Sequence, residues 1–234
     1  MGWPELIVFV RHGESAGNVL TVEERAAFEQ PTHAYPLTER GRRQAEITGA
    51  YVRERFRPFD VCWSSYYRRA KETAALVFHG KVYEDARLAE GQRGIYHTYT
   101  RDELMRYFPK EIERKKREGL YHHRPIGGEN WPDIELRIHS FLGTLARDGD
   151  GKRVLIVGHG HWLILFQKLL EHFGIEEAER RYREGAVANA SVTMFEGFPR
   201  KTSVFTRLVE NKGMYAVPWK GILEENPLTV APPV

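Results

Sequence analysis

The stretch that decides the fold lies near the N-terminus and reads Leu6-Ile7-Val8-Phe9-Val10-Arg11-His12-Gly13-Glu14-Ser15. Residues 6–10 are continuously apolar and rich in β-branched side chains, which is typical of a parallel strand buried on both faces. The run ends abruptly in Arg-His-Gly, so we expect the strand to open into a polar loop at its carboxyl end. Open α/β sheets place their binding sites at that edge.

A second run of the same kind lies far along the chain. Residues 154–157 read Val-Leu-Ile-Val and are followed by Gly158-His159-Gly160-His161, before an amphipathic segment that begins at Trp162. This pattern again indicates a buried strand that ends in a polar loop. Two strands are thus expected to deliver a histidine followed by glycine to the same edge of one sheet.

Strands and helices alternate through the rest of the chain. Periodicity and turn residues predict helices over residues 38–57, from 66 onward, over 100–107 and over about 127–147, and strands over 60–63, 81–83, 191–195 and 203–208. The last two strands are expected to form a hairpin. Residues 19–37 predict a loop with room for a short helix, and the prolines of the tail predict a loosely held end.

These elements predict an α/β fold, namely a three-layer α/β/α sandwich around a mostly parallel central sheet. No repeat or linker divides the chain, so residues 1–234 are expected to form a single domain with a sizeable core. Residues 84–128 are the least regular part. We interpret them as a partly helical insertion that covers the active edge of the sheet.

Composition narrows the class of protein. Hydrophobic content of 41% and charged content of 29% are ordinary for a globular protein, and the net charge of +3 gives slight support to an anionic substrate. The single cysteine, Cys62, excludes an intrachain disulfide, and its apolar surroundings predict a buried thiol. No stretch has the pattern of a membrane span or a signal peptide, so a cytoplasmic location is expected.

Three segments together resemble the signatures of the histidine phosphatase superfamily, which has the phosphoglycerate mutase-like fold. They are Arg11-His12-Gly13-Glu14-Ser15 with Asn18, Ser64-Ser65 followed by Arg69-Ala70 and Thr73-Ala74, and Val157-Gly158-His159-Gly160. The resemblance covers most of residues 5–196, and the phosphatase branch is favoured. It implies that Arg69 binds phosphate and that Glu90, in a Leu-x-Glu segment, is the general acid.

Phosphoryl transfer requires charge to be neutralised on three equatorial oxygens while the nucleophile and the leaving group stand in line. Arg11 and Arg69 can do this without a metal, because each guanidinium offers bidentate, permanently charged donors. His12 would attack phosphorus and become a phosphohistidine. His159 would stabilise the phosphate from the other side as a hydrogen-bond donor, helped by the backbone at Gly160.

Further groups complete the predicted site. Asn18 adds an uncharged donor, and Gly13 leaves room for a backbone carbonyl or the phosphate to come close. An alkoxide is a poor leaving group, so a general acid is required. Glu90 takes that role in our prediction, with Glu14 and Glu129 as the next candidates.

The remaining polar segments predict no cofactor. No pair of histidines has the helical spacing of a zinc site with a third ligand nearby, so no metal is expected. The basic run at residues 114–117 has no interleaved aromatic side chain and is interpreted as a solvated helix face rather than a nucleic-acid site. His97, His122, His123 and His161 are interpreted as surface or packing residues. Membrane binding is not indicated, and the sequence leaves a homodimer open.

The predicted function is a cofactor-independent phosphomonoesterase that acts on a small phosphorylated substrate. Its identity depends on how residues 19–37 and 84–128 fold over the phosphate. A bisphosphate-dependent phosphoglycerate mutase is an alternative, although mutases of this family carry a Trp-Arg-Arg-Ser segment where residues 114–119 here read Arg-Lys-Lys-Arg-Glu-Gly. A non-catalytic phosphate-binding scaffold is a second alternative, but it would have lost a motif residue, and none is lost.

Overall fold

The structure of the protein is a computed structural model that describes residues 2–56, 58–185, 187–197, 209–210 and 216–223. Within these ranges six strands form one sheet in the order β3-β2-β4-β1-β5-β6. Their bounds are β1 Leu6–Arg11, β2 Val61–Ser64, β3 Val82–Glu84, β4 Arg153–Gly158, β5 Val192–Gly197 and β6 Val209–Glu210.

β1 lies inside the sheet, parallel to β4 on one side and antiparallel to β5 on the other. β4 is also parallel to β2, and β2 to β3, so the sheet is mostly parallel as predicted. In the pair of β1 and β4, Arg11 stands opposite Gly158. The next residue of each chain segment is a histidine, and the register therefore brings His12 and His159 to the same edge.

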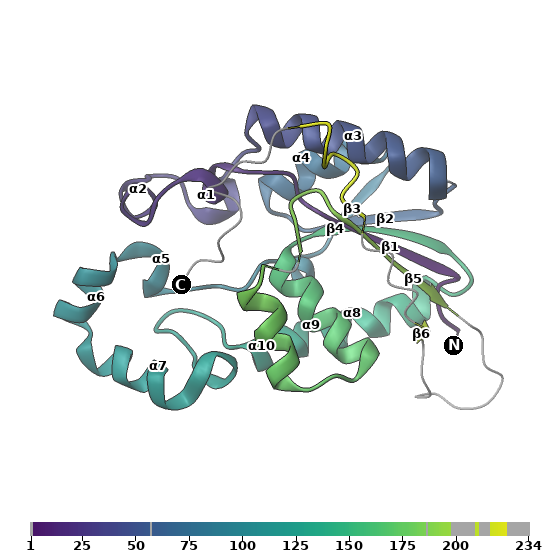
Figure 1. Cartoon of the computed structure of the whole chain (residues 1–234). Coiled ribbons are helices and arrows are strands. Elements are labelled where there is room, and N and C mark those ends of the chain that lie inside the picture. The colour runs from purple at the N-terminus through teal and green to yellow at the C-terminus, as the bar shows by residue number, and fades with distance from the viewer. Residues whose placement is uncertain (1, 57, 186, 198–208, 211–215, 224–234) are drawn as a thin grey trace.

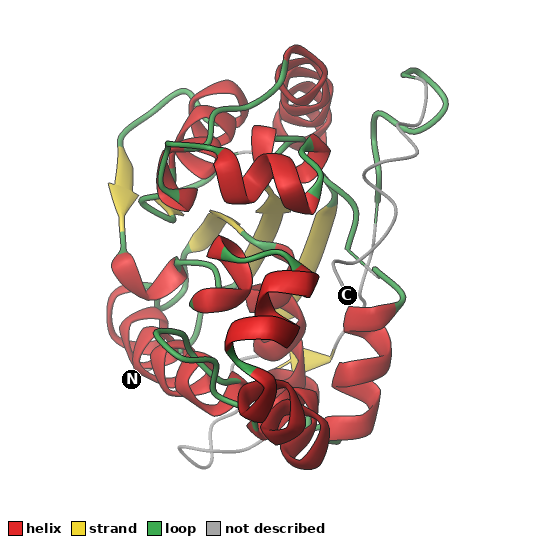
Figure 2. Cartoon of the chain, turned by 90° about the vertical axis from the view of Figure 1, so that its left-hand side faces the viewer, coloured by secondary structure: helices red, strands yellow, loops and turns green. Residues whose placement is uncertain are grey.

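Helices cover both faces of this sheet, which confirms the three-layer sandwich. Figure 1 shows α3 (Glu39–Phe56) and α4 (Arg68–Val77) above the sheet, and α8 (Trp131–Asp148), α9 (Gly160–Glu171) and α10 (Ile175–Arg183) below it. In Figure 2 the strands lie between these two helical layers.

Side chains of β1 alternate between the two layers, which explains why its apolar run is uninterrupted. Ile7 and Phe9 belong to the core cluster built with α8 and α9, whereas Val8 and Val10 belong to the cluster built with α3 and α4. Cys62 packs in the second cluster, so its thiol is buried as predicted.

The two long helices lie where their periodicity predicts them, except that α8 begins at Trp131 rather than at about residue 127. Each turns one apolar face to the sheet, and the buried side chains include Ala45, Val52 and Phe56 of α3 and Ile134, Ile138, Phe141 and Leu145 of α8. α8 begins with a capping box, in which Asn130 and Asp133 each accept a hydrogen bond from the other's backbone N–H.

Residues 84–128, which we call the cap, are more helical than the sequence predicts. They contain η2 (Ala86–Leu88), α5 (Ile95–Thr98), α6 (Arg101–Tyr107) and α7 (Pro109–His122). Periodicity predicts α6 but not the full length of α7, because α7 is highly charged and has few apolar positions. Its start is fixed by Pro109, whose missing N–H costs nothing in a first helical turn.

The segment after β1 is a loop with short helices, as expected. These are α1 (Ala16–Val19), α2 (Val22–Ala27) and η1 (Thr32–Ala34). In Figure 1 both this segment and the cap helices α5, α6 and α7 lie beyond the edge at which β1 ends. α1 and α2 lie above that edge, and the cap helices lie below it. Two segments far apart in the sequence thus flank the carboxyl edge of the sheet.

The C-terminal part begins with β5, which confirms the first strand of the predicted hairpin. The second strand, at residues 203–208, lies outside the described residues, as does the tail with Pro227, Pro232 and Pro233. β6 is antiparallel to β5. Residues 216–223, which we call the strap, return to the sheet, where Ala216 and Val192 exchange two backbone hydrogen bonds of 2.8 and 2.9 Å.

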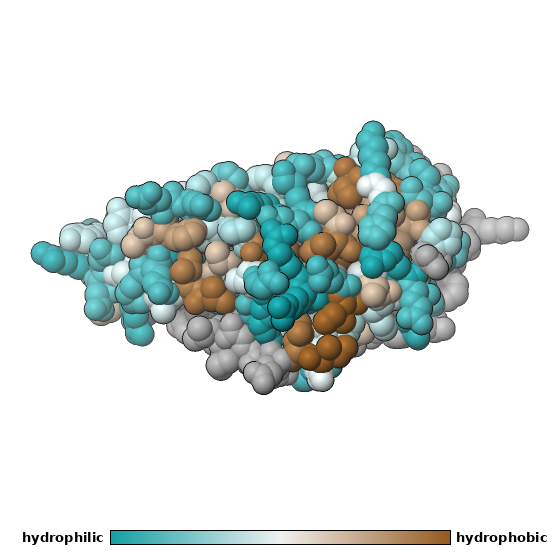
Figure 3. Space-filling model, turned by 90° about the horizontal axis from the view of Figure 1, so that it is seen from above, coloured by the Kyte–Doolittle hydropathy of each residue, from teal (hydrophilic) through white to brown (hydrophobic). Residues whose placement is uncertain are grey.

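The surface above α3 is largely hydrophilic, with separate apolar patches (Figure 3). None of the helices in the described ranges combines the length and the hydropathy that a membrane crossing requires.

Candidate active site

The two predicted histidines meet at the carboxyl edge of the sheet. Their ring centroids are 5.2 Å apart, and the rings are inclined by 64°. His12 is 3% exposed and His159 is fully buried. The register of β1 and β4 fixes this distance, so the pairing of the two sequence motifs is confirmed.

One guanidinium bridges the two rings. Arg69, in the first turn of α4, donates from Nε to His12 Nε2 at 3.1 Å and from Nη2 to His159 Nδ1 at 3.3 Å. Its Nη1 donates to the carbonyl of Thr32 at 2.9 Å. Burial lowers the pKa of Arg69 to about 10, so the group remains charged at neutral pH. A buried, permanently charged fork therefore lies between the predicted nucleophile and the second histidine.

The hydrogen bonds of His12 determine which ring nitrogen can react. Nδ1 lies 2.7 Å from the carbonyl of Gly13, which only accepts, so Nδ1 carries the proton. Nε2 then keeps its lone pair and accepts from Arg69. Burial, followed by the charges of Arg69 and Arg11, holds the pKa of His12 well below its usual 6.5. His12 is thus neutral, and Nε2 is its nucleophilic atom.

Gly13 is required by close backbone packing. A Cβ at this position would lie 2.3 Å from the carbonyl oxygen of Gly41. The N–H of Gly13 donates to Thr73 Oγ1 at 3.0 Å. The approach of a backbone carbonyl to Gly13 agrees with the prediction.

His159 differs from the prediction in its protonation. Because Arg69 can only donate, Nδ1 of His159 accepts, and Nε2 carries the proton and donates to Ser65 Oγ at 2.9 Å. Burial and the charge of Arg69 hold the pKa of His159 well below 6.5. In the free protein the nitrogen beside Arg69 is therefore an acceptor. Donation to phosphate requires a proton at Nδ1, which the Ser65 hydroxyl permits because it can either accept from or donate to Nε2.

Arg11 lies beside the histidines at the end of β1. Its Nη1 donates to the carbonyl of Val187, and its charge contributes to the low pKa values of both rings. Gly160, the first residue of α9, lets it come close, since a Cβ there would lie 3.3 Å from Arg11 Nε.

Asn18 takes part in the loop that follows β1. Its Oδ1 accepts from the N–H and the hydroxyl of Ser15, at 3.0 and 2.9 Å, and from Asn189 Nδ2 at 3.4 Å. The loop thus uses the amide oxygen of Asn18, and its amide nitrogen is the group that suits the predicted role as a donor to phosphate.

The three candidate acids have different surroundings. Glu14 is buried and accepts from Thr38 Oγ1 at 2.7 Å and from Arg40 Nη1 at 3.1 Å. Glu129 accepts from Nε and Nη2 of Arg137 at 2.8 and 3.0 Å. Both carboxylates are thus held by an arginine outside the site.

Glu90, the predicted general acid, lies near Arg69. Its Oε1 accepts from the N–H of Gly91 at 3.1 Å, and its charge raises the pKa of Arg69 against the larger effect of burial. Glu90 therefore lies close enough to interact with the bridging guanidinium, and of the three carboxylates it remains the candidate acid.

Three supporting residues were not predicted as part of the site. Ser65 holds His159, Thr73 holds the backbone of Gly13, and Asn189 donates to the carbonyl of His12 at 3.0 Å. Ser65 directly follows β2 at the same sheet edge as the histidines, which is a signal that the sequence offers. Asn189 precedes β5 and offers no comparable signal.

Positive charge gathers on the cap side of the site. Burial lowers the pKa values of Arg25 and Lys115, and the positive charge of Arg93 lowers both further. Burial and Arg93 also lower the pKa of His97 to about 4, and His97 Nε2 lies 3.1 Å from the hydroxyl of Tyr35. His97 is thus a packed residue at the border between the cap and Arg69. The field around the histidines favours anions.

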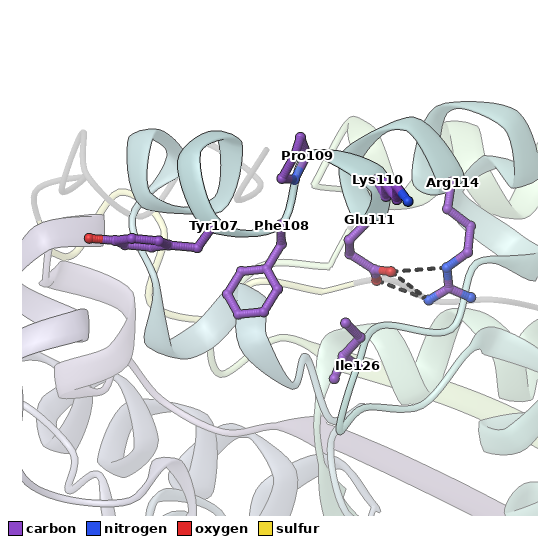
Figure 4. A pocket seen from close by; sticks show the side chains of 7 residues that line it. All are labelled: Tyr107, Phe108, Pro109, Lys110, Glu111, Arg114 and Ile126. Atoms are coloured by element: carbon purple, nitrogen blue, oxygen red, sulfur yellow. Dashed lines mark hydrogen bonds and ion pairs between the residues drawn. The ribbon is translucent and has the colours of Figure 1, made fainter.

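A separate cavity of about 460 Å³ lies in the cap, away from the predicted site residues (Figure 4). It is lined by Tyr107, Phe108, Pro109, Lys110, Glu111, Arg114 and Ile126. Arg114 donates to Glu111, and Lys115 lies over the ring of Tyr96 at 4.4 Å. The basic run is thus only partly the solvated face that the sequence predicts.

The other histidines are surface or packing residues, as predicted. His122 is exposed, and His123 is buried with Nε2 2.9 Å from Glu111 Oε1. His161 packs against Trp131 and Tyr182, and burial lowers its pKa to about 3. Within the described ranges, no three His, Cys, Asp or Glu side chains come together as a metal site would require.

Known proteins share this sequence pattern and this fold. Residues 7–208 match the model of the histidine phosphatase superfamily, branch 1. Over 183 residues the chain is 32% identical to 2,3-bisphosphoglycerate-dependent phosphoglycerate mutase 2 of Gloeobacter violaceus. The aligned region covers 75% of this chain and 80% of that protein.

Two solved phosphatases have similar structures. The alpha-ribazole phosphatase from Shigella flexneri matches with a TM-score of 0.71 and 21% identity over 91% of this chain and 96% of that one. A mycobacterial glucosyl-3-phosphoglycerate phosphatase matches with a TM-score of 0.63 and 25% identity over 82% and 90%. The family match extends from β1 through β5 and includes both histidines and the arginine between them, and the chain therefore belongs to the histidine phosphatase superfamily.

Proposed function

We propose that the protein is a phosphomonoesterase that works through a phosphohistidine at His12 and needs no metal. The observation that carries this proposal is the position of Arg69, which contacts Nε2 of His12 and Nδ1 of His159 at once. A phosphate placed there would meet a neutral nucleophile on one side and fixed positive charge around it. Electrostatic stabilisation of this kind can replace a metal in phosphoryl transfer.

In the first step, the lone pair of His12 Nε2 forms a bond to phosphorus while the bond from phosphorus to the ester oxygen breaks. The proton stays on Nδ1, which donates to the carbonyl of Gly13, so the positive charge that develops on the ring is hydrogen-bonded. Arg11 and Arg69 neutralise the equatorial oxygens, and Asn18 supplies an uncharged donor. Glu90 gives its proton to the leaving oxygen.

In the second step, water attacks phosphorus and the bond to Nε2 breaks. Glu90, now a carboxylate, accepts the proton of the water. Inorganic phosphate leaves, and the lone pair of His12 is restored. Each group thus returns to its starting state, and the cycle consumes only water and the ester.

Supporting evidence for the substrate class is the positive charge of Arg93 and Lys115 on the cap and of Arg25 on α2, since the charge of Arg93 acts on both of the others. It favours a small substrate with negative charge beyond the transferred phosphoryl group. The similarity to the Gloeobacter mutase makes phosphoglycerate mutase the second candidate function. A mutase would use the same first step but return the phosphoryl group to a second hydroxyl rather than to water.

The test is phosphate release from a panel of sugar phosphates, nucleotides and phosphoglycerates, with a chelator present and no bisphosphate primer. We expect the wild-type protein to release phosphate from at least one ester and to be phosphorylated after acid-free quenching. His12→Ala should neither release phosphate nor become phosphorylated. His79→Ala, at an exposed histidine of the same chain, is the matched control and should behave as wild type. Interconversion of phosphoglycerates far faster than phosphate release would instead support the mutase.

A further inference from the structure

We propose that Trp219, in the strap, is a positioning residue that holds the loop carrying the nucleophile in its reactive geometry. This inference rests on the proposed function, because it concerns His12 as the attacking group. The strap lies beyond residue 208, where the match to the family ends.

The first contact runs through Asn189. The buried indole of Trp219 donates from Nε1 to the carbonyl of Asn189 at 2.7 Å. The side chain of Asn189 in turn donates to the carbonyl of His12 at 3.0 Å, and the N–H of Ala190 donates to the same oxygen at 3.1 Å. The carbonyl of the nucleophile is thus held by two donors from a segment that Trp219 fixes.

This segment has a backbone that needs such support. Ala190 has a φ of +49°, in the left-handed region that disfavours residues with a Cβ. Its carbonyl accepts from Thr48 Oγ1 at 2.8 Å. The hydrogen bond from Trp219 adds a constraint one residue earlier.

The second contact runs through Arg40. Its guanidinium lies over the ring of Trp219, 5.0 Å from the ring centroid. The same guanidinium donates to Glu14 at 3.1 Å, and the N–H of Glu14 donates to Gln44 Oε1 at 2.8 Å. Glu14 follows His12 by two positions, so both contacts of Trp219 end on the loop of residues 12–14.

The orientation of that loop decides where the imidazole points. Nδ1 of His12 donates to the carbonyl of Gly13, so a rotation of the peptide between the two residues would turn the ring and move Nε2. In-line attack is sensitive to such misplacement. Phosphate binding depends on the guanidinium groups of Arg11 and Arg69, whereas Trp219 donates to the carbonyl of Asn189 and not to either guanidinium. Loss of Trp219 should therefore slow phosphoryl transfer more than it weakens phosphate binding.

The test compares two substitutions. Trp219→Phe removes the Nε1–H but keeps a ring under Arg40, whereas Trp219→Leu removes both. Trp3→Phe is the matched control, because Trp3 is also buried and its Nε1 has no hydrogen-bond partner among the described residues. The measurements are the single-turnover rate of phosphoenzyme formation from p-nitrophenyl phosphate, the Kd of inorganic phosphate and the Tm.

We expect Trp219→Phe to slow phosphoenzyme formation about tenfold, the effect of one lost hydrogen bond, and Trp219→Leu to slow it further. The Kd of phosphate should stay within about twofold, and Trp3→Phe should equal wild type. Asn189→Ala breaks the same connection at its other end and should reproduce the slowing, which keeps the test informative if Trp219 variants fold poorly.

An unchanged rate in Trp219→Phe or Asn189→Ala would overturn the positioning role, as would a loss of phosphate affinity that parallels the loss of rate. Failure of the proposed function would look different. Wild-type protein would then form no phosphoenzyme at all.

Discussion

Nε of Arg69 donates a 3.1 Å hydrogen bond to Nε2 of His12, the ring atom that carries the free lone pair. The same guanidinium donates from Nη2 to Nδ1 of His159 at 3.3 Å. One buried arginine therefore orients both imidazole rings relative to each other.

The first prediction concerns this fork. Arg69→Lys should reduce kcat/KM by about three orders of magnitude, because one ammonium cannot reach His12, His159 and the carbonyl of Thr32 at the same time. Steady-state kinetics with p-nitrophenyl phosphate provide the measurement. Arg68→Lys, at the exposed neighbouring position, is the control and should stay near wild type. A charge-only role for Arg69 would be indicated if the lysine variant lost less than tenfold.

The second prediction concerns pH and stability. Burial lowers the pKa values of His12, His159 and His161 in the folded protein, whereas all three return to about 6.5 on unfolding. Below that pH the unfolded chain binds protons that the folded protein does not, so the free energy of unfolding should fall as pH falls from 7 to 5.5.

Urea unfolding at the two pH values measures this effect. His161→Phe removes one of the three groups without touching the site, and should reduce the pH-dependent loss by about 1 kcal/mol. A free energy of unfolding that stays constant or rises as the pH falls from 7 to 5.5 would show that these histidines are protonated in the folded state.

The third prediction tests the assignment of Glu90 as the acid. An alkyl phosphate needs its leaving oxygen protonated, whereas p-nitrophenolate leaves unaided. Glu90→Gln should therefore slow single-turnover phosphoenzyme formation about a hundredfold more for a sugar phosphate than for the aryl ester. Glu84→Gln, at an exposed carboxylate, is the control. Equal slowing with both substrates would move the acid role to another group.

The fourth prediction concerns two glycines. A Cβ at Gly41 would lie 1.9 Å from the carbonyl oxygen of Glu14, so Gly41→Ala must push the loop after β1 away from α3. We expect Gly41→Ala to lower the free energy of unfolding by about 2–4 kcal/mol and to reduce activity as well. Gly143→Ala, in an exposed position of α8 with no atom near the new Cβ, should instead stabilise the protein by about 0.5–1 kcal/mol. Urea unfolding of both variants checks the contrast.

The part of the fold that the sequence predicts is the part set by strong periodicity. β1 and β4 are short apolar runs that end in polar residues, and α3 and α8 each show one apolar face. The meeting of His12 and His159 follows from the same information, since parallel neighbours end at one edge. The charged helix α7 could not be predicted in this way, because it has few apolar positions and many charged ones, which form ion pairs such as Arg114 with Glu111.

Protonation could not be predicted either. Whether His159 donates or accepts depends on Arg69 on one side and Ser65 on the other, which lie 90 and 94 residues away in the sequence. The support from Asn189 and the strap likewise depends on long-range contacts, and such contacts leave no periodic pattern in the sequence. Roles of single residues were thus predictable where they follow from strand ends, and not where they follow from hydrogen-bond partners.

The order of strands has a consequence for how activity is acquired during folding. β1 and β4 are neighbours in space although β2, β3 and the entire cap lie between them in the sequence. Neither half of the chain can assemble the pair of histidines, and closing the large loop between them is slow compared with forming the local helices. The meeting of the two histidines is therefore a property of the completed sheet, and a chain that ends within β4 would lack His159 altogether.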